Sequence, residues 1–96
     1  MKPSVALNLH RDAARAAAAR FRSANLRVFG SAVAGADEEG SDLDLLVDPL
    51  PGATLFDLGA LQMELEDILG VPVDLLTPGD LPPKLRAKVL SEARAV

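Results

Sequence analysis

The most regular alternation of apolar and polar residues lies in SDLDLLVD, residues 41–48. Successive side chains of a β-strand point to opposite faces. The alternation therefore gives one apolar set and one mostly acidic set: Leu43, Leu45 and Val47 on one face, and Asp42, Asp44, Leu46 and Asp48 on the other. This pattern predicts a strand with one apolar face and one face that carries carboxylates.

Two shorter β-prone runs accompany this segment. Residues 26–30, LRVFG, end in a glycine, and residues 71–77, VPVDLLT, are followed by proline and glycine. Branched and aromatic residues bounded by such turn residues are typical of strands. We therefore expect three strands in all.

Helical patterns fill the intervals between the strands. Residues 54–70 repeat apolar side chains at spacings of three and four up to a terminal glycine, and residues 10–24 are rich in the strong helix formers alanine and arginine. Residues 31–40 open with an N-cap serine, which suits one or two helical turns. Residues 84–95 suit a closing helix.

The predicted order is α-β-α-β-α-β-α, with no internal repeat and no linker. Helices that alternate with strands indicate an α/β (α+β) fold, in which helices pack on a small mixed β-sheet. A chain of 96 residues can build one hydrophobic core and not two. We therefore expect a single domain over residues 1–96.

Composition narrows the choice of ligands. No apolar run approaches the ~20 residues of a membrane span and no secretory pattern opens the chain, so we expect a cytoplasmic protein. Cysteine is absent and His10 is the sole histidine, so any metal must be held by oxygen ligands. The net charge of −4 and the three aromatic residues argue against nucleic acid as the primary ligand.

The candidate chemistry begins with two carboxylates. Asp42 and Asp44 stand at positions i and i+2 of a strand, which places them on one face roughly 6 to 7 Å apart. Mg²⁺ suits such a site because it takes a few carboxylate oxygens and fills its other positions with water and substrate phosphate. Asp74, between the apolar Val73 and Leu75, would join the same face.

Gly30 and Ser31 stand at the end of the first predicted strand, and ten residues separate Ser31 from Asp42. A glycine at a tight turn lets the backbone approach a phosphate, and the serine and the amides beyond it can donate hydrogen bonds to phosphate oxygens. A metal that bridges phosphate and acceptor oxygens would then support an in-line displacement. Asp74 would deprotonate or orient the acceptor hydroxyl.

The segment GSAVAGADEEGSDLDLLVD resembles the signature of the polymerase-β nucleotidyltransferase superfamily in its minimal form, and the resemblance covers nearly the entire chain. It implies that Gly30 and Ser31 hold the triphosphate of ATP. It also implies that Asp42 and Asp44 bind Mg²⁺ and that Asp74 is the third carboxylate of the metal and catalytic site.

Minimal members of this superfamily resemble the antitoxin half of two-gene systems whose toxin is a helical HEPN ribonuclease. This resemblance implies an enzyme that transfers AMP from ATP to a hydroxyl of that toxin. The chain departs from the commonest pattern at Ala34, where an arginine usually precedes the glycine. Ala34 favours the alternative of a non-catalytic antitoxin that masks its partner sterically, whereas the retained aspartates favour the enzyme.

The remaining charged residues have simpler explanations. Asp48 beside Pro49 is expected in a turn, and His10 is expected to be exposed or to cap a helix. The basic residues of the last helix are expected on an exposed face, unless one of them reaches the nucleotide phosphates: Lys84, Arg86 and Lys88.

Overall fold

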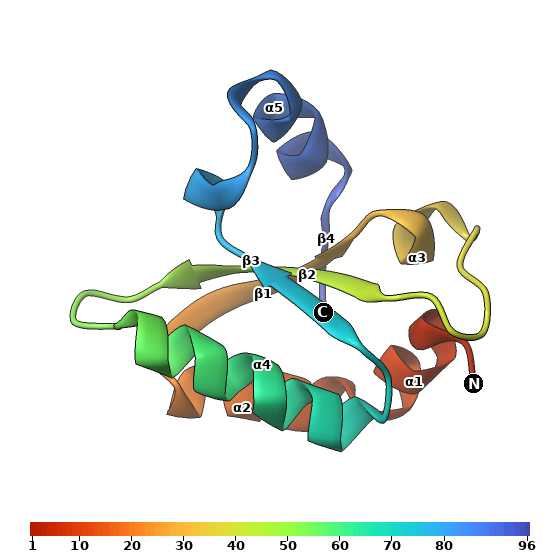
Figure 1. Ribbon diagram of the computed structural model, residues 1–96, viewed down its shortest axis with the longest axis horizontal. Helices are drawn as coiled ribbons and strands as arrows, with labels where there is room; N and C mark the ends of the chain where they lie inside the picture. The colour runs from red at the N-terminus through yellow and green to blue at the C-terminus, as the bar shows by residue number, and fades with distance from the viewer.

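The computed structural model describes residues 1–96. Figure 1 shows its elements, which follow one another in the order α1 Pro3–Leu9, α2 Arg11–Arg20, β1 Ser23–Phe29, α3 Ser31–Ala34, β2 Leu43–Pro49, α4 Leu55–Leu69, β3 Val73–Leu76, the 3-10 helix η1 Pro78–Asp80, α5 Pro83–Glu92 and β4 Arg94–Ala95. The predicted α/β fold is confirmed.

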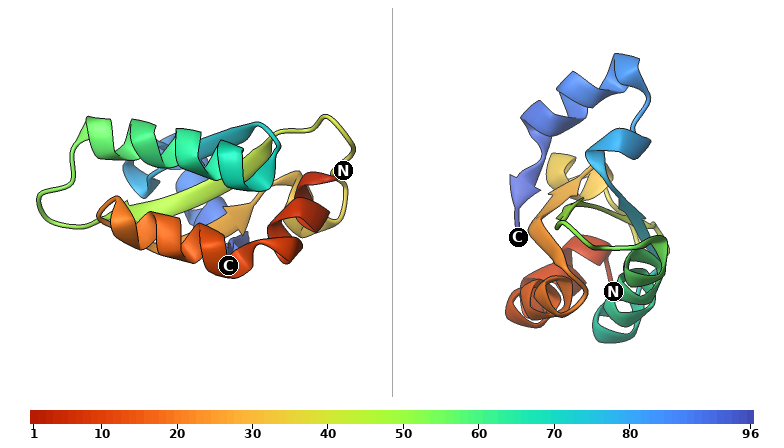
Figure 2. Two further views of the ribbon diagram at one scale, coloured as in Figure 1. Left: turned by 90° about the horizontal axis from the view of Figure 1, so that it is seen from below. Right: turned by 90° about the vertical axis from the view of Figure 1, so that its left-hand side faces the viewer.

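The four strands form one mixed sheet in the order β3-β2-β1-β4. β1 pairs antiparallel with both β2 and β4, and β2 pairs parallel with β3. α1, α2 and α4 lie on one face of this sheet, and α5 stands on the opposite side (Figures 1 and 2). The central pair β1 and β2 therefore separates a helix-covered face from a more open one.

The core lies between the sheet and α2 and α4. Leu43, Leu45 and Val47 are fully buried in it, as the alternation in β2 predicted. Buried alanines of α2 and leucines of α4 complete it: Ala14, Ala17, Ala18, Leu61, Leu65 and Leu69. Small side chains on α2 allow this helix to pack close to α4 and to β1, whose surfaces it contacts. Leu46, on the acidic face of β2, is also buried.

Helix α4 has the ends that its sequence predicts. Thr54 caps the N-terminus: its hydroxyl accepts from the Asp57 backbone N–H, and the Asp57 carboxylate accepts from the Thr54 N–H. Gly70 ends the helix in the left-handed conformation. An N-cap of this kind stabilises a helix by about 1 kcal/mol, and the left-handed glycine lets the last carbonyls find hydrogen-bond donors. No helix of this structure is long and apolar enough to cross a membrane.

The expected order of four helices and three strands is present, and the structure adds an element at each end of the chain. The structure adds α1, which starts with Pro3 and buries Ala6 and Leu7, and it adds the short β4. α2 ends at Arg20 instead of continuing to residue 24, because residues 23–29 join the sheet as β1. α5 ends at Glu92, and the residues that follow it pair with β1. Pairing with distant strands overrides local helix propensity at these points.

Candidate functional site

The turn after β1 brings Gly30 against Asp44 of β2. Gly30 has φ 76° and ψ −148°, a combination that only glycine adopts readily. A Cβ atom placed there would overlap the Asp44 carboxylate and would lie 3.2 Å from its Cγ atom. The antiparallel register explains this approach, because Phe29 is the partner of Asp44. Glycine is thus required both for the backbone angle and for the space.

Strand pairing also brings Asp74 beside Asp44. The two residues are register partners in the parallel pair of β2 and β3, so their side chains leave the sheet on the same side. Asp44 is half-buried, and burial raises the pKa of its carboxyl. The charge of Asp74 and then that of Asp42 raise the pKa of Asp44 further. The charges of Asp74 and Asp42 therefore both act on the carboxyl of Asp44.

Asp42 precedes β2 instead of lying within it, which corrects the predicted strand boundary. A tight turn fixes the chain just before it: the Glu38 N–H donates to the Ser41 hydroxyl and the Ser41 N–H donates to the Glu38 carbonyl. The Leu43 N–H donates to the Pro72 carbonyl and extends the ladder to this point. Asp42 is exposed where Asp44 is half-buried.

A buried acid that the sequence did not single out anchors the same loop. Asp37 is 4% exposed, and its carboxylate accepts a 2.8 Å hydrogen bond from the Ser4 backbone N–H at the start of α1. This hydrogen bond lowers the pKa of Asp37. The partner belongs to a helix that the sequence pattern did not predict, so no local signal revealed the contact.

The donor set suits a hard divalent cation. As the side chains stand, no group of three or more acidic or histidine side chains is arranged to hold a metal ion. Mg²⁺ commonly takes only one or two protein carboxylates and completes its shell with water and substrate phosphates. The raised pKa of Asp44 reflects burial and carboxylate repulsion, and a cation relieves repulsion of this kind. Asp42 and Asp44 therefore fit Mg²⁺ chemically.

Asp48 does not lie in a turn, contrary to the expectation. It is part of β2, where its carboxylate accepts from Arg27 at 2.9 Å and from the Asn25 side chain at 2.9 Å. These hydrogen bonds, that of Asn25 first, lower the pKa of Asp48. This pairing depends on the register of β1 against β2. The proline that follows Asp48 suggests a turn and carries no information about that register.

The basic residues of α5 divide into two kinds. Arg86 donates to the carbonyls of Pro78 and Leu81, and so ties α5 to the segment that follows β3. Lys84 and Lys88 are exposed, as expected. His10 is exposed at the junction of α1 and α2, and its side chain makes no capping hydrogen bond.

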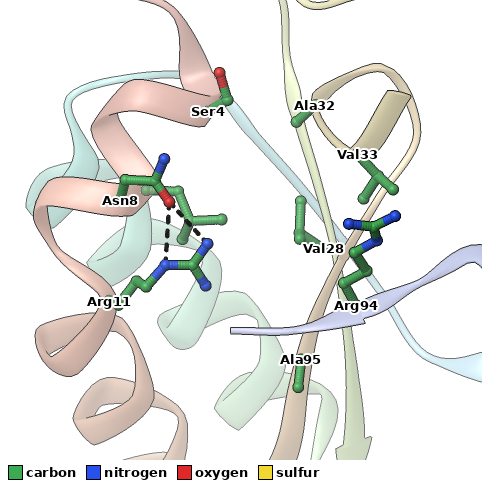
Figure 3. A pocket seen from close by; sticks show the side chains of 9 residues that line it. Ser4, Asn8, Arg11, Val28, Ala32, Val33, Arg94 and Ala95 are labelled. Atoms are coloured by element: carbon green, nitrogen blue, oxygen red, sulfur yellow. Dashed lines mark hydrogen bonds between the residues drawn. The ribbon is translucent and has the colours of Figure 1, made fainter. Parts of the chain in front are cut away.

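Two hollows flank the short helix α3. One, of about 210 Å³, lies among α1, β1, α3 and β4 and includes Asn8, Arg11 and Arg94 (Figure 3). The other, of about 510 Å³, lies where Gly30 and α3 face the end of α5 and the start of β4. Arg94 lines both hollows. The sequence gave no signal for Arg94, because β4 is two residues long.

Comparison with known proteins identifies the protein family to which this fold and these acidic residues belong. The chain belongs to the nucleotidyltransferase domain family, whose profile matches residues 10–96. The resemblance seen in the sequence is therefore confirmed, and so is the prediction of a nucleotidyltransferase enzyme.

Individual relatives narrow the group. The chain is 42% identical over 66 residues to a Methanocaldococcus jannaschii protein provisionally named protein adenylyltransferase, over 69% of this chain and 71% of that protein. It is 38% identical over 73 residues to protein adenylyltransferase MntA of Thermococcus cleftensis, over 76% and 74% of the two chains.

Solved structures agree with this grouping. A structure provisionally assigned as a minimal nucleotidyltransferase superposes with a TM-score of 0.88 at 42% identity, over 100% of this chain and 97% of that chain. A toxin–antitoxin crystal structure with AMP-PNP shares the fold, with a TM-score of 0.66 at 18% identity over 84% of this chain and 70% of that chain.

Proposed function

We propose that this chain transfers AMP from ATP to a hydroxyl group of a protein partner, with Mg²⁺ held by Asp42 and Asp44. The arrangement around Asp44 carries the proposal: the carboxylate lies between the Gly30 turn and Asp74, and the charges of Asp74 and Asp42 both act on it. The names of the relatives support AMP as the transferred group.

Gly30 and Ser31 are suited to hold the triphosphate beside the metal-binding acids. Gly30 presents bare backbone beside Asp44, and the Ser31 hydroxyl makes no hydrogen bond within the chain, so both are available to phosphate oxygens. When bound there, Mg²⁺ would neutralise phosphate charge and polarise the α-phosphate. Asp42 and Asp44 would hold that ion, and Gly30 and Ser31 would orient the triphosphate.

Asp74 is suited to act on the acceptor. It is exposed and lies on β3, which is an edge strand of the sheet, so a partner can reach it without displacing the fold. Its carboxylate would take the proton of the acceptor hydroxyl as the acceptor oxygen bonds to the α-phosphorus of ATP. The bond from that phosphorus to the β-phosphate oxygen breaks, and pyrophosphate leaves.

The surroundings of Asp74 favour a protein acceptor. Asp74 is exposed, and it lines none of the pockets that residues 1–96 form. A docked protein would exclude water and place its hydroxyl in line with the α-phosphate. The toxin of a two-gene system, of the helical HEPN type, is the partner we propose, in agreement with the toxin–antitoxin assembly that shares this fold.

The experiment incubates a co-expressed partner with the chain, ATP and Mg²⁺ and measures the intact mass of the partner. We expect an increase by one or more AMP groups, and no increase with the Asp42→Asn, Asp44→Asn double variant. A partner that binds and is neutralised without any change in mass would instead identify a masking antitoxin with a vestigial nucleotide site.

A further inference from the structure

The hollow beside Gly30 contains an arginine with no partner in the chain. Arg94 is exposed, and its guanidinium takes part in no ion pair and no hydrogen bond, whereas every other arginine donates to an acceptor. Figure 3, which draws the other hollow, shows its side chain reaching from β4 toward Val33 of α3, a residue that lines both hollows. A free arginine beside a cavity is available to bind an anion from solution.

Strand pairing fixes the position of Arg94. Its Cα is the register partner of Val28, two residues before Gly30. The Val96 N–H donates to the Leu26 carbonyl of β1, and the Arg15 side chain of α2 donates to the Val96 carbonyl at 2.6 Å, so two hydrogen bonds to the Val96 backbone hold this segment in place. The location of Arg94 therefore does not depend on contacts of its own side chain.

The hollow is open because small residues line much of it. Gly30 and Ala34 line it from the turn and α3, and Ser91 and Glu92 line it from α5. Neither glycine nor alanine fills the space or contributes charge. Glu92, which makes no ion pair, is the one acid of the lining, so a bound anion would be attracted by Arg94 and repelled by Glu92.

The Gly30 turn therefore has an acidic residue on one side and the hollow with Arg94 on the other. The carboxylate of Asp44 approaches the turn from β2, and the hollow with Arg94 adjoins the same residue. Asp44 pairs with Phe29 and Arg94 pairs with the core residue Val28, so their side chains leave the sheet on opposite faces. A polyphosphate that passes around the Gly30 turn from one face to the other would have metal-binding acids at its reacting end and an arginine at its terminal end. An arginine fork matches two phosphate oxygens and binds them more strongly than a neutral donor does.

We propose that Arg94 binds the terminal phosphates of the nucleotide and so places the α-phosphate at Asp42 and Asp44. This inference rests on the proposed function, since it assumes that a nucleoside triphosphate occupies the acidic site. It assigns the cationic contact to the C-terminal strand of the chain itself and not to a partner.

The test measures the affinities of ATP and AMP, each with Mg²⁺, by calorimetric titration of the full chain. We expect Arg94→Ala to weaken ATP binding about tenfold or more and to leave AMP binding unchanged, because AMP lacks the terminal phosphates. Arg94→Lys should recover part of the loss, since lysine keeps the charge without the fork. Glu92→Gln should tighten ATP binding severalfold because it removes the repelling charge.

Arg20→Ala is the matched control. It removes the same charge from α2, where Arg20 pairs with Glu64, and should leave both affinities unchanged. Thermal denaturation of each variant checks that the fold persists, and Arg94→Lys and Glu92→Gln keep the test valid if Arg94→Ala unfolds.

Wild-type ATP affinity in Arg94→Ala, or an equal loss for ATP and AMP, would overturn the inference. If the Asp42→Asn, Asp44→Asn variant loses ATP binding while Arg94→Ala retains it, the proposed function stands and Arg94 alone is excluded. If the wild-type chain does not bind ATP with Mg²⁺ at all, the proposed function and this inference both fail.

Discussion

Gly30 and Asp44 occupy neighbouring places in the structure that leave no room for a side chain at position 30. A Cβ atom on Gly30 would lie 3.2 Å from Asp44 Cγ and 3.4 Å from Asp44 Cβ, and it would overlap the carboxylate oxygen. The turn that would hold phosphate is therefore in contact with the acid that would hold the metal. A side chain added at position 30 would displace the Asp44 carboxylate.

This contact predicts the effect of Gly30→Ala. The positive φ alone should destabilise the fold by about 1 to 3 kcal/mol, and the overlap with Asp44 should displace the carboxylate and abolish metal-dependent ATP binding. Gly35→Ala is the control, because Gly35 has φ 72° but no atom within 4 Å of an added Cβ. It should lose about 1 to 2 kcal/mol and retain ATP binding, as measured by denaturant unfolding and calorimetry. Equal loss of binding in both variants would show that backbone strain, and not Asp44, is responsible.

Removing the charges of Asp42 and Asp44 should abolish ATP binding without lowering the stability of the fold. The double variant Asp42→Asn, Asp44→Asn should lose Mg²⁺-dependent ATP binding, while its melting temperature without metal should not fall. The reason is that burial and the charges of Asp74 and Asp42 raise the pKa of Asp44, so the ionised carboxylate is unfavourable in the metal-free fold at neutral pH. Unchanged ATP affinity would refute the assignment of the metal site.

Asp74→Asn should affect transfer far more than nucleotide binding. Asp74 is exposed on the edge strand, and we assign it to the acceptor hydroxyl, so its loss should lower the transfer rate by a factor of about 100 or more. The affinity for ATP with Mg²⁺ should change little. An equal loss of both quantities would make Asp74 a further metal ligand.

Asp48 should stabilise the fold only while it is ionised. Hydrogen bonds from Asn25 and Arg27 lower the pKa of Asp48 below its ordinary value of 3.8, so its contribution is complete above that value and is lost as the pH falls through the lower, folded-state pKa. Asp48→Asn should reduce the free energy of unfolding at pH 7 by about 0.5 to 1 kcal/mol, since the side chain is 44% exposed and water screens the pair.

The measurement is denaturant unfolding of wild type and Asp48→Asn between pH 7 and acid pH. The difference between the two proteins should narrow as the pH falls below about 4. A difference that stays constant over this range would show that the charge of Asp48 contributes nothing to stability.

Local patterns were sufficient to predict part of this fold. The alternation of Leu43, Leu45 and Val47 predicted the buried face of β2, and the spacing of leucines up to Gly70 predicted α4. Both signals are local, because side-chain direction in a strand and helix capping depend on residues a few positions apart. The proximity of Asp74 to Asp44 also followed from alternation, once the two strands were assumed to be neighbours.

The missed features depend on contacts between distant parts of the chain. Arg94 meets the Gly30 turn through β4, which is too short to carry a periodic pattern. Asp48 is paired by the register of β1 against β2, and Asp37 is buried by α1. Such contacts leave no mark in the local sequence, so the assignment of Asp48 to a turn was wrong and Asp37 and Arg94 were overlooked.

AMP transfer to a protein partner at the Asp42 and Asp44 site is read directly from the intact mass of the partner. The chain would be incubated with ATP and Mg²⁺ in two arms, one with the co-expressed partner and one with glycerol, aminoglycosides or nucleotides as small acceptors. We predict that the partner gains one or more AMP groups, that the Asp42→Asn, Asp44→Asn variant adds none, and that small acceptors are modified poorly. Efficient modification of a small acceptor without any protein partner would exclude a protein-specific transferase, and so would a partner whose mass is unchanged after incubation with a wild-type chain that binds ATP and Mg²⁺.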